Sequence, residues 1–284
     1  MYKQFSRTEV AGVSLPRFLI GSNWFLGFSH KSAATDRRIR EQFTKKEDFF
    51  PIFEEYMKYG INAVMGVPST APLFADAIKY AEDKLGKEII IIDTPMLNVD
   101  DNTAARKETQ ELIKKSAEIG AKFCLIHHSS IEALVCKNTK TIDRISDYTE
   151  MIREAGMIPG ATAHMPEIII YSDMNNYDIQ TYTQPYNSAG FLMQVEVEYI
   201  AKIINDSKKP VMTIKPMAAG RLTPYTGFNF VWNTIREQDM VTVGVMSPQE
   251  AAESVEISFA AIERRFPDVE GRTSVNTNQD AFGK

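Results

Sequence analysis

The stretch PVMTIKPMAAGRLTP, residues 210–224, decides the fold. It predicts a short buried strand, Val211 to Ile214, which ends on Lys215 and opens into a turn of small residues. Arg221 follows that turn. An apolar strand that ends in a charged residue and a glycine-containing loop is how α/β barrels build their catalytic face. We therefore expect Lys215 at the functional face of such a barrel.

Seven further apolar segments alternate with amphipathic, helix-like segments along the chain. The segment 88–93 contains the run IIII, which is typical of a parallel strand buried on both faces. Eight such alternations with short connections predict an α/β fold, a (β/α)8 TIM barrel with an N-terminal hairpin. A doubly wound open sheet is the alternative, but the first strand lacks the glycine-rich dinucleotide turn of such sheets. The expected strands are 17–22, 62–67, 88–93, 122–127, 157–162, 179–184, 211–214 and 240–245. The expected helices are 46–59, 72–84, 103–118, 141–154, 191–205, one within 228–236, and 248–262. Residues 166–174 are expected to form a short helix or turn, and residues 28–46 a long polar loop.

Composition and charge narrow the classes of function. The 284 residues are 44% hydrophobic and 24% charged, as in ordinary globular proteins, and we expect residues 1–266 to form one barrel domain and 267–284 a polar tail. The net charge of −5 argues against a nucleic-acid partner. No apolar run reaches the ~18–20 residues of a membrane span. Two cysteines without a CxxC motif, and an N-terminus unlike a signal peptide, indicate a reducing, cytoplasmic setting.

The carboxyl ends of the strands supply the candidate site residues, because barrel enzymes place their chemistry there. Three of the four histidines fall at these ends, and His30 lies in the long loop expected to overhang the same face. A lysine at the end of a buried strand needs a partner or a catalytic role, since burying an unpaired charge is costly. The candidate catalytic residues are His127, His164, Lys215 and Asp93, and the candidate substrate-binding residues are Asn23, Trp24, His128, Gln184, Tyr186, Asn187 and Arg221.

Several chemistries suit these residues. A lysine whose pKa is lowered in a pocket serves as a base or forms a Schiff base with a carbonyl, and a histidine shuttles protons near neutral pH. Histidines with Asp93 could instead hold a divalent metal, although no short-spaced ligand motif such as HExxH is present. Structural roles are the alternative. His127 or His128 could form a strand-end hydrogen bond, His164 a turn cap and Asp93 a loop cap. Lys215 could form an ion pair with Asp93 or a neighbouring carboxylate. The basic loop 28–46 could hold an anionic group or be a solvated loop.

Seven motifs along the chain carry a family resemblance. In chain order they are YKQFSRTEVAGVSLPRFLIGSN, GINAVMGVPS, CLIHHS, PGATAHMP, TYTQPYN, KPMAAGRLTP and TVGVMSPQEAAESVE. In the same order they resemble the hairpin and first strand, the second strand and the later strand ends of the aldo/keto reductase superfamily. The resemblance implies an active-site role for His127. It also implies contacts from Gln184 to a nicotinamide and from the turn at Ser247 to the cofactor phosphate, should NADP bind.

The departures from that family bear on the reaction. The family's second strand ends in an Asp with a Tyr shortly after, whereas this chain has Gly66-Val67-Pro68-Ser69; its third strand ends in a Lys, whereas this one ends in Asp93. Usual hydride transfer therefore lacks its acid. We expect an enzyme with altered, proton-transfer chemistry (isomerase, lyase or hydrolase type) on a small polar sugar- or carbonyl-like substrate. An NAD(P)-dependent oxidoreductase and a non-catalytic binding barrel are the alternatives. The cofactor, NADP or a divalent metal, and the oligomeric state are left open.

Overall fold

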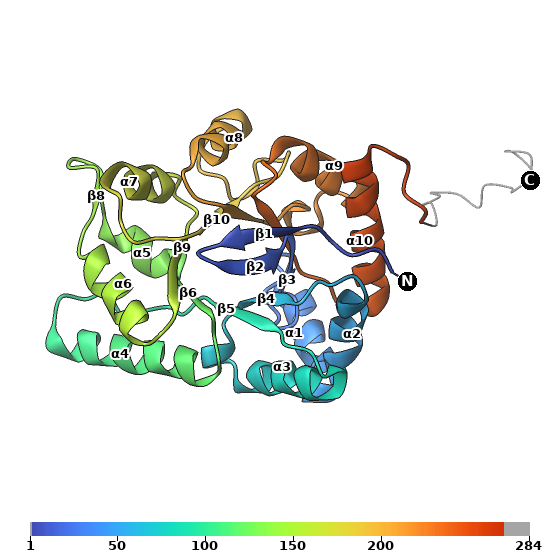
Figure 1. Cartoon of the computed structure of the whole chain (residues 1–284), viewed down its shortest axis with the longest axis horizontal. Coiled ribbons are helices and arrows are strands. Elements are labelled where there is room, and N and C mark those ends of the chain that lie inside the picture. Colours follow the sequence, from blue (N-terminus) through green and yellow to red (C-terminus); the bar gives the residue numbers. More distant parts are fainter. Residues whose placement is uncertain (1, 270–284) are drawn as a thin grey trace, which may run out of the picture.

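Eight parallel strands close into a barrel in the computed structural model, which describes residues 2–269 (Figure 1). The barrel strands follow one another in the order β10-β11-β12-β3-β4-β5-β6-β9, and β9 pairs with β10 to close the ring. Their bounds are β3 (Phe18–Gly21), β4 (Ala63–Gly66), β5 (Ile90–Asp93), β6 (Phe123–Ile126), β9 (Ile158–Thr162), β10 (Tyr182–Pro185), β11 (Val211–Ile214) and β12 (Met240–Val243). The predicted α/β TIM barrel is confirmed.

Helices surround the barrel. They are α1 (Ala33–Gln42), α2 (Phe50–Lys58), α3 (Pro72–Leu85), α4 (Thr103–Glu118), α5 (His128–Ile131), α6 (Ile145–Glu154), α7 (Glu167–Asn175), α8 (Val197–Asp206), α9 (Pro224–Thr234) and α10 (Pro248–Glu263). Short 3-10 turns are η1 (Lys46–Asp48), η2 (Pro68–Thr70), η3 (Glu132–Leu134) and η4 (Ala218–Gly220). Among the described residues, none of the helices combines the length and apolar character that a membrane crossing requires.

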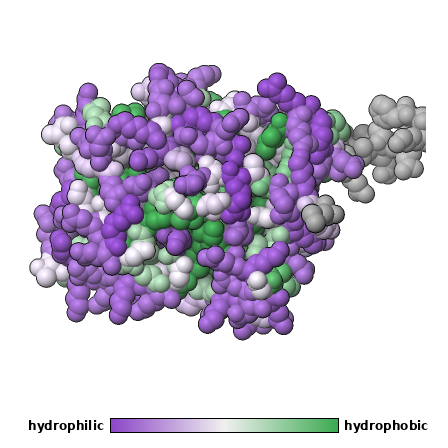
Figure 2. Space-filling model, viewed as in Figure 1, coloured by the Kyte–Doolittle hydropathy of each residue, from purple (hydrophilic) through white to green (hydrophobic). Residues whose placement is uncertain are grey.

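The predicted N-terminal hairpin, β1 (Arg7–Val10) and β2 (Val13–Pro16), lies across the amino-terminal end of the barrel. Val10 and Leu15 pack with inward-facing strand residues such as Met212 and Met240, so the hairpin closes the bottom of the inner core. Figure 2 shows this face of the molecule: hydrophilic side chains cover most of it, and apolar ones are exposed around its centre beside the hairpin. The opposite, carboxyl-terminal mouth is therefore the end at which a site can form.

Strand alternation separates an inner from an outer core. Leu19, Met65, Ile92, Leu125 and Met212 belong to the small cluster inside the ring. Apolar neighbours along the same strands belong to the larger cluster between the strands and the helices: Ile20, Val64, Ile91, Cys124 and Val211. Because successive side chains of a strand point to opposite faces, this alternation decides which strand-end residues reach the mouth.

An ion pair anchors the start of β11 and β12. The buried carboxylate of Asp239 accepts from Arg236 Nε and Nη2 at 2.9 and 2.7 Å, and from Val211 N at 2.9 Å. Arg236 also donates to the carbonyls of Ser207 and Lys209. Every charge in this network has partners, which is the condition under which a buried ion pair is tolerated.

Several sequence-based boundaries are wrong. The central part of the expected loop 28–46 is helix α1, begun by Ser32, whose Oγ accepts from Thr35 N, and held by one buried residue, Ile39. The expected helix 141–154 begins only at Ile145, because Thr141–Ile142 (β8) pairs with Val135–Cys136 (β7). The helix expected over 191–205 is α8, and that expected within 228–236 begins at Pro224, after the N-cap Thr223. Most of the expected polar tail, residues 270–284, lies outside the described residues.

Candidate active site at the carboxyl-terminal mouth

The inward-facing register of β6 and β9 carries two histidines to the mouth. His127 follows Leu125 by two residues, and His164 follows Gly160 and Thr162 by the same spacing. His128, on the first turn of α5, adds a third ring. The ring centroids of His127 and His128 are 4.2 Å apart, and those of His128 and His164 are 4.1 Å apart. The structure thus brings together the three histidines that the sequence placed at strand ends.

His127 has a defined tautomer. Its Nδ1 accepts from the backbone N–H of Ser129 at 3.4 Å and lies 2.7 Å from the Ser129 hydroxyl, which donates to it. With Nδ1 acting as acceptor, the ring carries its proton on Nε2. His127 also begins α5 as its N-cap, so the ring is fixed by local hydrogen bonds rather than by a carboxylate. The imidazole therefore offers an N–H donor.

Lys215, at the end of β11, lies close enough to these rings to act on their charge, and it has no counter-charge within the described residues. Its backbone is in the left-handed region, with φ of 61°, and Ala218 and Ala219 follow with φ of 49° and 56°. Such conformations are costly for residues other than glycine and gather at functional sites. Lys215 has no ion-pair or hydrogen-bond partner within residues 2–269, and burial lowers the pKa of its amine to about 8. A partly buried lysine held this way is a group available for chemistry.

The positive charge of Lys215 contributes to lowering the pKa of all four histidines. Burial and then the charge of Lys215 lower the pKa of His164 to about 3. Burial, His128 and Lys215 lower the pKa of His127 to about 4. The pKa values of His128 and His30 are also lowered, chiefly by burial, with Lys215 contributing to both. At neutral pH the four rings are uncharged beside the amine.

Aromatic and basic side chains form the rim of the mouth. The Lys31 amine lies 5.2 Å from the ring centre of Trp24, and Trp24 packs so closely on Gly244 that a Cβ there would lie 2.7 Å from the ring. The guanidinium of Arg221 lies 4.0 Å from the ring centre of Phe191. These pairs come from the loops after β3, β10 and β11 and place cationic groups around the histidines.

Two predicted site residues point away from the mouth. Asp93 pairs in register with Cys124 of the neighbouring strand, and Gln184 pairs in register with Thr213. Both residues lie on the outer face of the barrel, towards the helices. The Asp93 carboxylate is fully buried, accepts from the Ser116 hydroxyl of α4, and has its pKa raised by burial. Gln184 is equally buried. Among the described residues no ion pair or hydrogen bond joins Lys215 to Asp93, so the pairing considered for them is not formed.

The other predicted substrate-binding residues have structural surroundings. Tyr186 is buried with its ring centre 5.0 Å from that of Phe230, and the buried Asn187 bonds the backbone of Phe191 through both Oδ1 and Nδ2. Asn187 thereby holds the loop that carries the Arg221–Phe191 contact. Asn23 is exposed next to Trp24.

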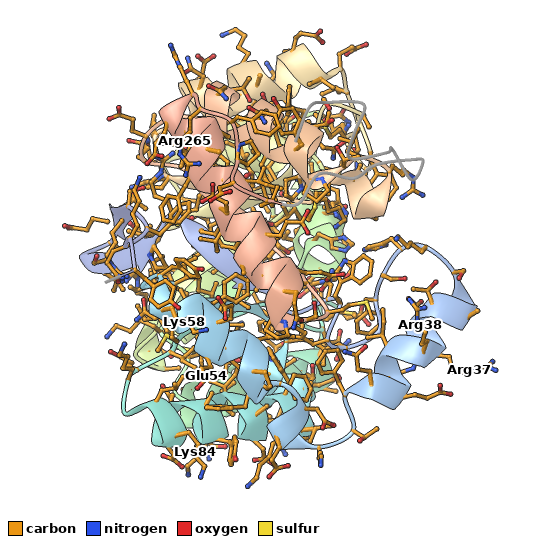
Figure 3. The ribbon with its side chains drawn as sticks, turned by 90° about the vertical axis from the view of Figure 1, so that its right-hand side faces the viewer. Arg37, Arg38, Glu54, Lys58, Lys84 and Arg265 are labelled. Carbon is orange, nitrogen blue, oxygen red and sulfur yellow. The ribbon has the colours of Figure 1, made fainter. Side chains whose placement is uncertain are left out.

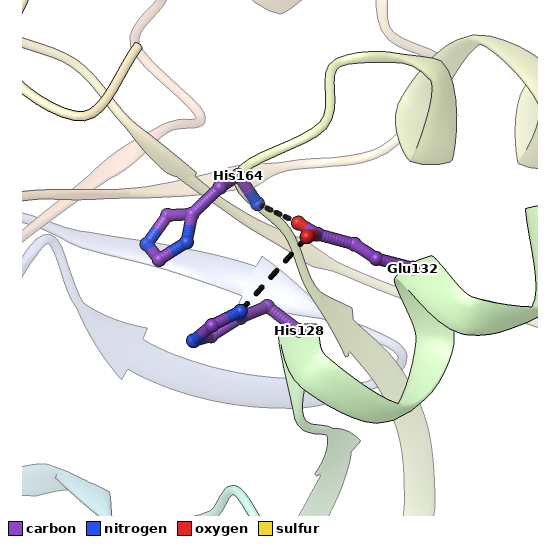
Figure 4. A group of neighbouring side chains, drawn as sticks. All are labelled: His128, Glu132 and His164. Atoms are coloured by element: carbon purple, nitrogen blue, oxygen red, sulfur yellow. Dashed lines mark hydrogen bonds and ion pairs between the residues drawn. The ribbon is translucent and has the colours of Figure 1, made fainter. Parts of the chain in front are cut away.

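Glu132 is a residue that the sequence reasoning missed. Its Oε1 accepts from the backbone N–H groups of His164 and Met165 at 2.6 and 2.9 Å, and its Oε2 lies 4.0 Å from His128 Nδ1 (Figure 4). The signal for it is the His128-x-x-x-Glu132 spacing, which places both side chains on one face of a helical segment. The carboxylate beside the histidines is therefore Glu132 and not the predicted Asp93.

The basic segment divides into a part at the mouth and a part in solvent. Lys31 lies so close to Gly220 that a Cβ on that glycine would lie 2.8 Å from the amine nitrogen. Arg37 and Arg38, by contrast, project from α1 away from the barrel (Figure 3). Lys31 therefore contributes positive charge at the mouth, whereas Arg37 and Arg38 do not.

The residues that the family resemblance assigns to a nicotinamide phosphate do not fit it. At the start of α10, Ser247 Oγ accepts from Glu250 N at 3.1 Å, and Glu250 Oε2 accepts from Met246 N at 2.7 Å. A carboxylate thus takes up an amide donor that a phosphate would use. Gln42 of α1 donates to Met246 O at 2.8 Å, so α1 lies beside the amino-terminal end of α10, as Figure 3 also shows.

Comparisons with known proteins identify the fold. No protein-family model matches the chain, and no curated protein matches it in sequence. Among solved structures, a protein described as an aldo-keto reductase from Pseudomonas aeruginosa is similar at 12% identity, with 92% of this chain and 99% of that one covered and a TM-score of 0.64. An aldo-keto reductase from Bacillus halodurans in its holo form gives 12% identity, 93% and 96% coverage, and 0.59. One from Klebsiella pneumoniae in complex with NADPH gives 13% identity, 94% and 92% coverage, and 0.55. The chain therefore has an aldo-keto-reductase-like TIM-barrel fold, and at these identities the likeness extends to the fold alone.

Proposed function

We propose that the chain is an enzyme that transfers protons on a small, anionic, carbonyl- or sugar-like substrate at the carboxyl-terminal mouth of the barrel. The observation that carries this proposal is Lys215, an amine without a counter-charge among four neutral histidines, on a backbone in the left-handed region. Barrel enzymes build their sites at this end. The absence of the tyrosine acid of the reductases in the second-strand motif favours proton transfer over hydride transfer.

Lys215 is the base in this proposal. A general base works best when its pKa lies near the working pH, and burial lowers the pKa of Lys215 to about 8. Near pH 8 a substantial fraction of the amine is neutral and able to take a proton from the carbon next to a carbonyl. No carboxylate pairs with Lys215 among the described residues, so the lone pair is free to react.

His127 is the hydrogen-bond donor to the substrate oxygen. Proton removal next to a carbonyl develops negative charge on the oxygen, and a fixed donor stabilises that charge. The Ser129 contacts leave the His127 proton on Nε2, and its pKa of about 4 keeps the ring neutral. A neutral imidazole acts here as an electrophile rather than as a base.

The charges at the mouth favour an anionic substrate. Lys215, Arg221 and Lys31 lie at or around it, against the single carboxylate of Glu132 in the histidine cluster. The other nearby acid, Asp36, is held by the backbone and hydroxyl of Ser29. A phosphate or carboxylate group on the substrate would offset this excess of positive charge.

Proton exchange in heavy water tests the proposal whatever the final product of the reaction is. Phosphorylated and carboxylated hydroxyketones, ketoses and hydroxyaldehydes are incubated with the protein in D2O, and loss of the proton next to the carbonyl is followed by NMR. We expect exchange with at least one of them, faster as the pH rises towards about 8 and level above it. Lys215→Met should abolish the exchange and His127→Gln should slow it by about 10²-fold or more.

Two results would contradict the assignment. Exchange that survives in Lys215→Met would show that Lys215 is not the base. An adduct on Lys215 trapped by borohydride would show that it is a Schiff-base nucleophile instead. Stabilisation by a ligand with no exchange in any compound would favour the non-catalytic binding barrel.

A further inference from the structure

Two imidazoles and one carboxylate meet beside the proposed proton-transfer groups. His128 and Glu132 stand four residues apart on the continuous segment formed by α5 and η3, and His164 follows β9. Their candidate ligand atoms all lie within 4.8 Å of one another (Figure 4). The three side chains come from two different elements, so the fold itself brings them together.

Glu132 is held in place while one of its oxygens stays available. Oε1 accepts from His164 N at 2.6 Å and from Met165 N at 2.9 Å, which fixes the carboxylate against the loop that carries His164. Oε2 faces His128 Nδ1 at 4.0 Å, too far for a hydrogen bond. No lysine or arginine pairs with Glu132 in the part of the chain that the structure describes.

The Glu132 side chain is only 19% exposed, and no lysine or arginine pairs with it within residues 2–269. The second carboxylate oxygen of Glu132, Oε2, faces the two imidazoles. The geometry thus leaves room for a cation between the three side chains.

We infer that His128, Glu132 and His164 form a binding site for a divalent transition-metal ion such as Zn²⁺. Two imidazole nitrogens and one carboxylate oxygen are a ligand set that suits zinc, and three protein ligands leave a fourth position open. Metal–ligand bonds of about 2.0–2.2 Å place ligand atoms ~3.3 Å apart in a tetrahedral site, so the ligand atoms must move closer by up to about 1.5 Å on binding.

The open position faces the mouth and not the helical layer, because His164 continues the inward alternation of β9. A metal held there would lie next to His127, whose ring centre is 4.2 Å from that of His128. A substrate oxygen bound to the metal would be polarised, which is one way a bound divalent ion assists catalysis. The inference goes beyond the proposed function and does not rest on it, because binding of the metal is measured directly.

Metal binding is tested on the full, tag-free chain, stripped with a chelator and then titrated with Zn²⁺ by calorimetry and with Co²⁺ by visible absorption. We expect about one ion per chain and the intense d–d bands of a four-coordinate Co²⁺ site. His164→Ala and His128→Asn should each weaken Zn²⁺ binding by about 10-fold or more and bleach the Co²⁺ bands. The two variants are independent, and circular dichroism confirms that each is folded.

His30→Asn is the matched control. His30 is another imidazole at the same mouth, outside the trio, and asparagine tolerates its left-handed backbone, φ of 55°. This variant should bind Zn²⁺ as the wild type does. Absence of stoichiometric binding in the wild type would overturn the inference. So would binding that persists in His164→Ala and His128→Asn, or binding that His30→Asn weakens as strongly as they do.

Discussion

Replacing Lys215 by methionine should make the protein more stable while removing the proposed base. Burial lowers the pKa of this amine from 10.5 to about 8. At about 1.36 kcal/mol per pKa unit, this shift of ~2.5 units corresponds to about 3 kcal/mol. Methionine matches the length of the apolar stem and has no charge to desolvate. In urea denaturation at pH 7 with a chelator present, Lys215→Met should gain up to about 3 kcal/mol.

The pH dependence gives this prediction its sign. The folded-state pKa of Lys215 lies below the unfolded one, so below about pH 8 both states are charged and the folded state has the full desolvation penalty. Between pH 8 and 10.5 the unfolded state binds more protons, and wild-type stability rises with pH. The advantage of Lys215→Met should therefore shrink across that window.

A surface control separates this effect from general effects of losing a lysine. Lys107 on α4 is 77% exposed, and Lys107→Met should change stability by less than about 0.5 kcal/mol. The reasoning would be refuted if Lys215→Met were less stable than the wild type at pH 7. It would be refuted equally if its advantage stayed constant from pH 8 to 10.5.

Two further variants test the buried charges of the fold. Burial raises the pKa of Asp93 above its unfolded value, so this residue lowers stability as pH rises from about 4 through its folded pKa. Asp93→Asn should remove that loss and be at least as stable as the wild type at pH 7. The measurement is urea denaturation from pH 4 to 8. A large destabilisation would show that the carboxylate is needed in its charged form. Arg236→Met leaves the buried Asp239 without its cation and should cost about 3–5 kcal/mol of stability in thermal unfolding. Arg153→Met, which breaks the exposed pair with Asp178, should cost only about 0–1 kcal/mol. Equal losses in the two variants would contradict this account.

The barrel is predictable from the sequence because its strands are short, apolar and buried on both faces. Helix α4 has the bounds that the sequence predicts, where Asn102 caps the start and Gly120 follows the end. Helix α1 escapes prediction because its polar composition hides a single buried residue, Ile39, and because its N-cap, Ser32, stands in a run of polar residues.

The residues of the candidate site can be predicted from the sequence only where the strand ends, and the direction of their side chains, can be predicted. His127 and His164 lie two residues after inward-facing strand positions, so their side chains also face inward and reach the mouth. Asp93 lies only one residue after the inward-facing Ile92, so its side chain points outward. The alternation could have separated these cases from the sequence alone. Lys215 escapes the alternation because its left-handed backbone redirects the side chain, which only the three-dimensional turn reveals.

The pKa of Lys215 tests the central claim most directly. In protein labelled with ¹³C at the lysine side chains, the ¹³Cε resonances are titrated by NMR, and Lys215→Met identifies the one that belongs to this residue. The account predicts one resonance that titrates near pH 8 and is missing from the variant. A Lys215 resonance that titrates near 10.5, with the exposed lysines, would contradict it.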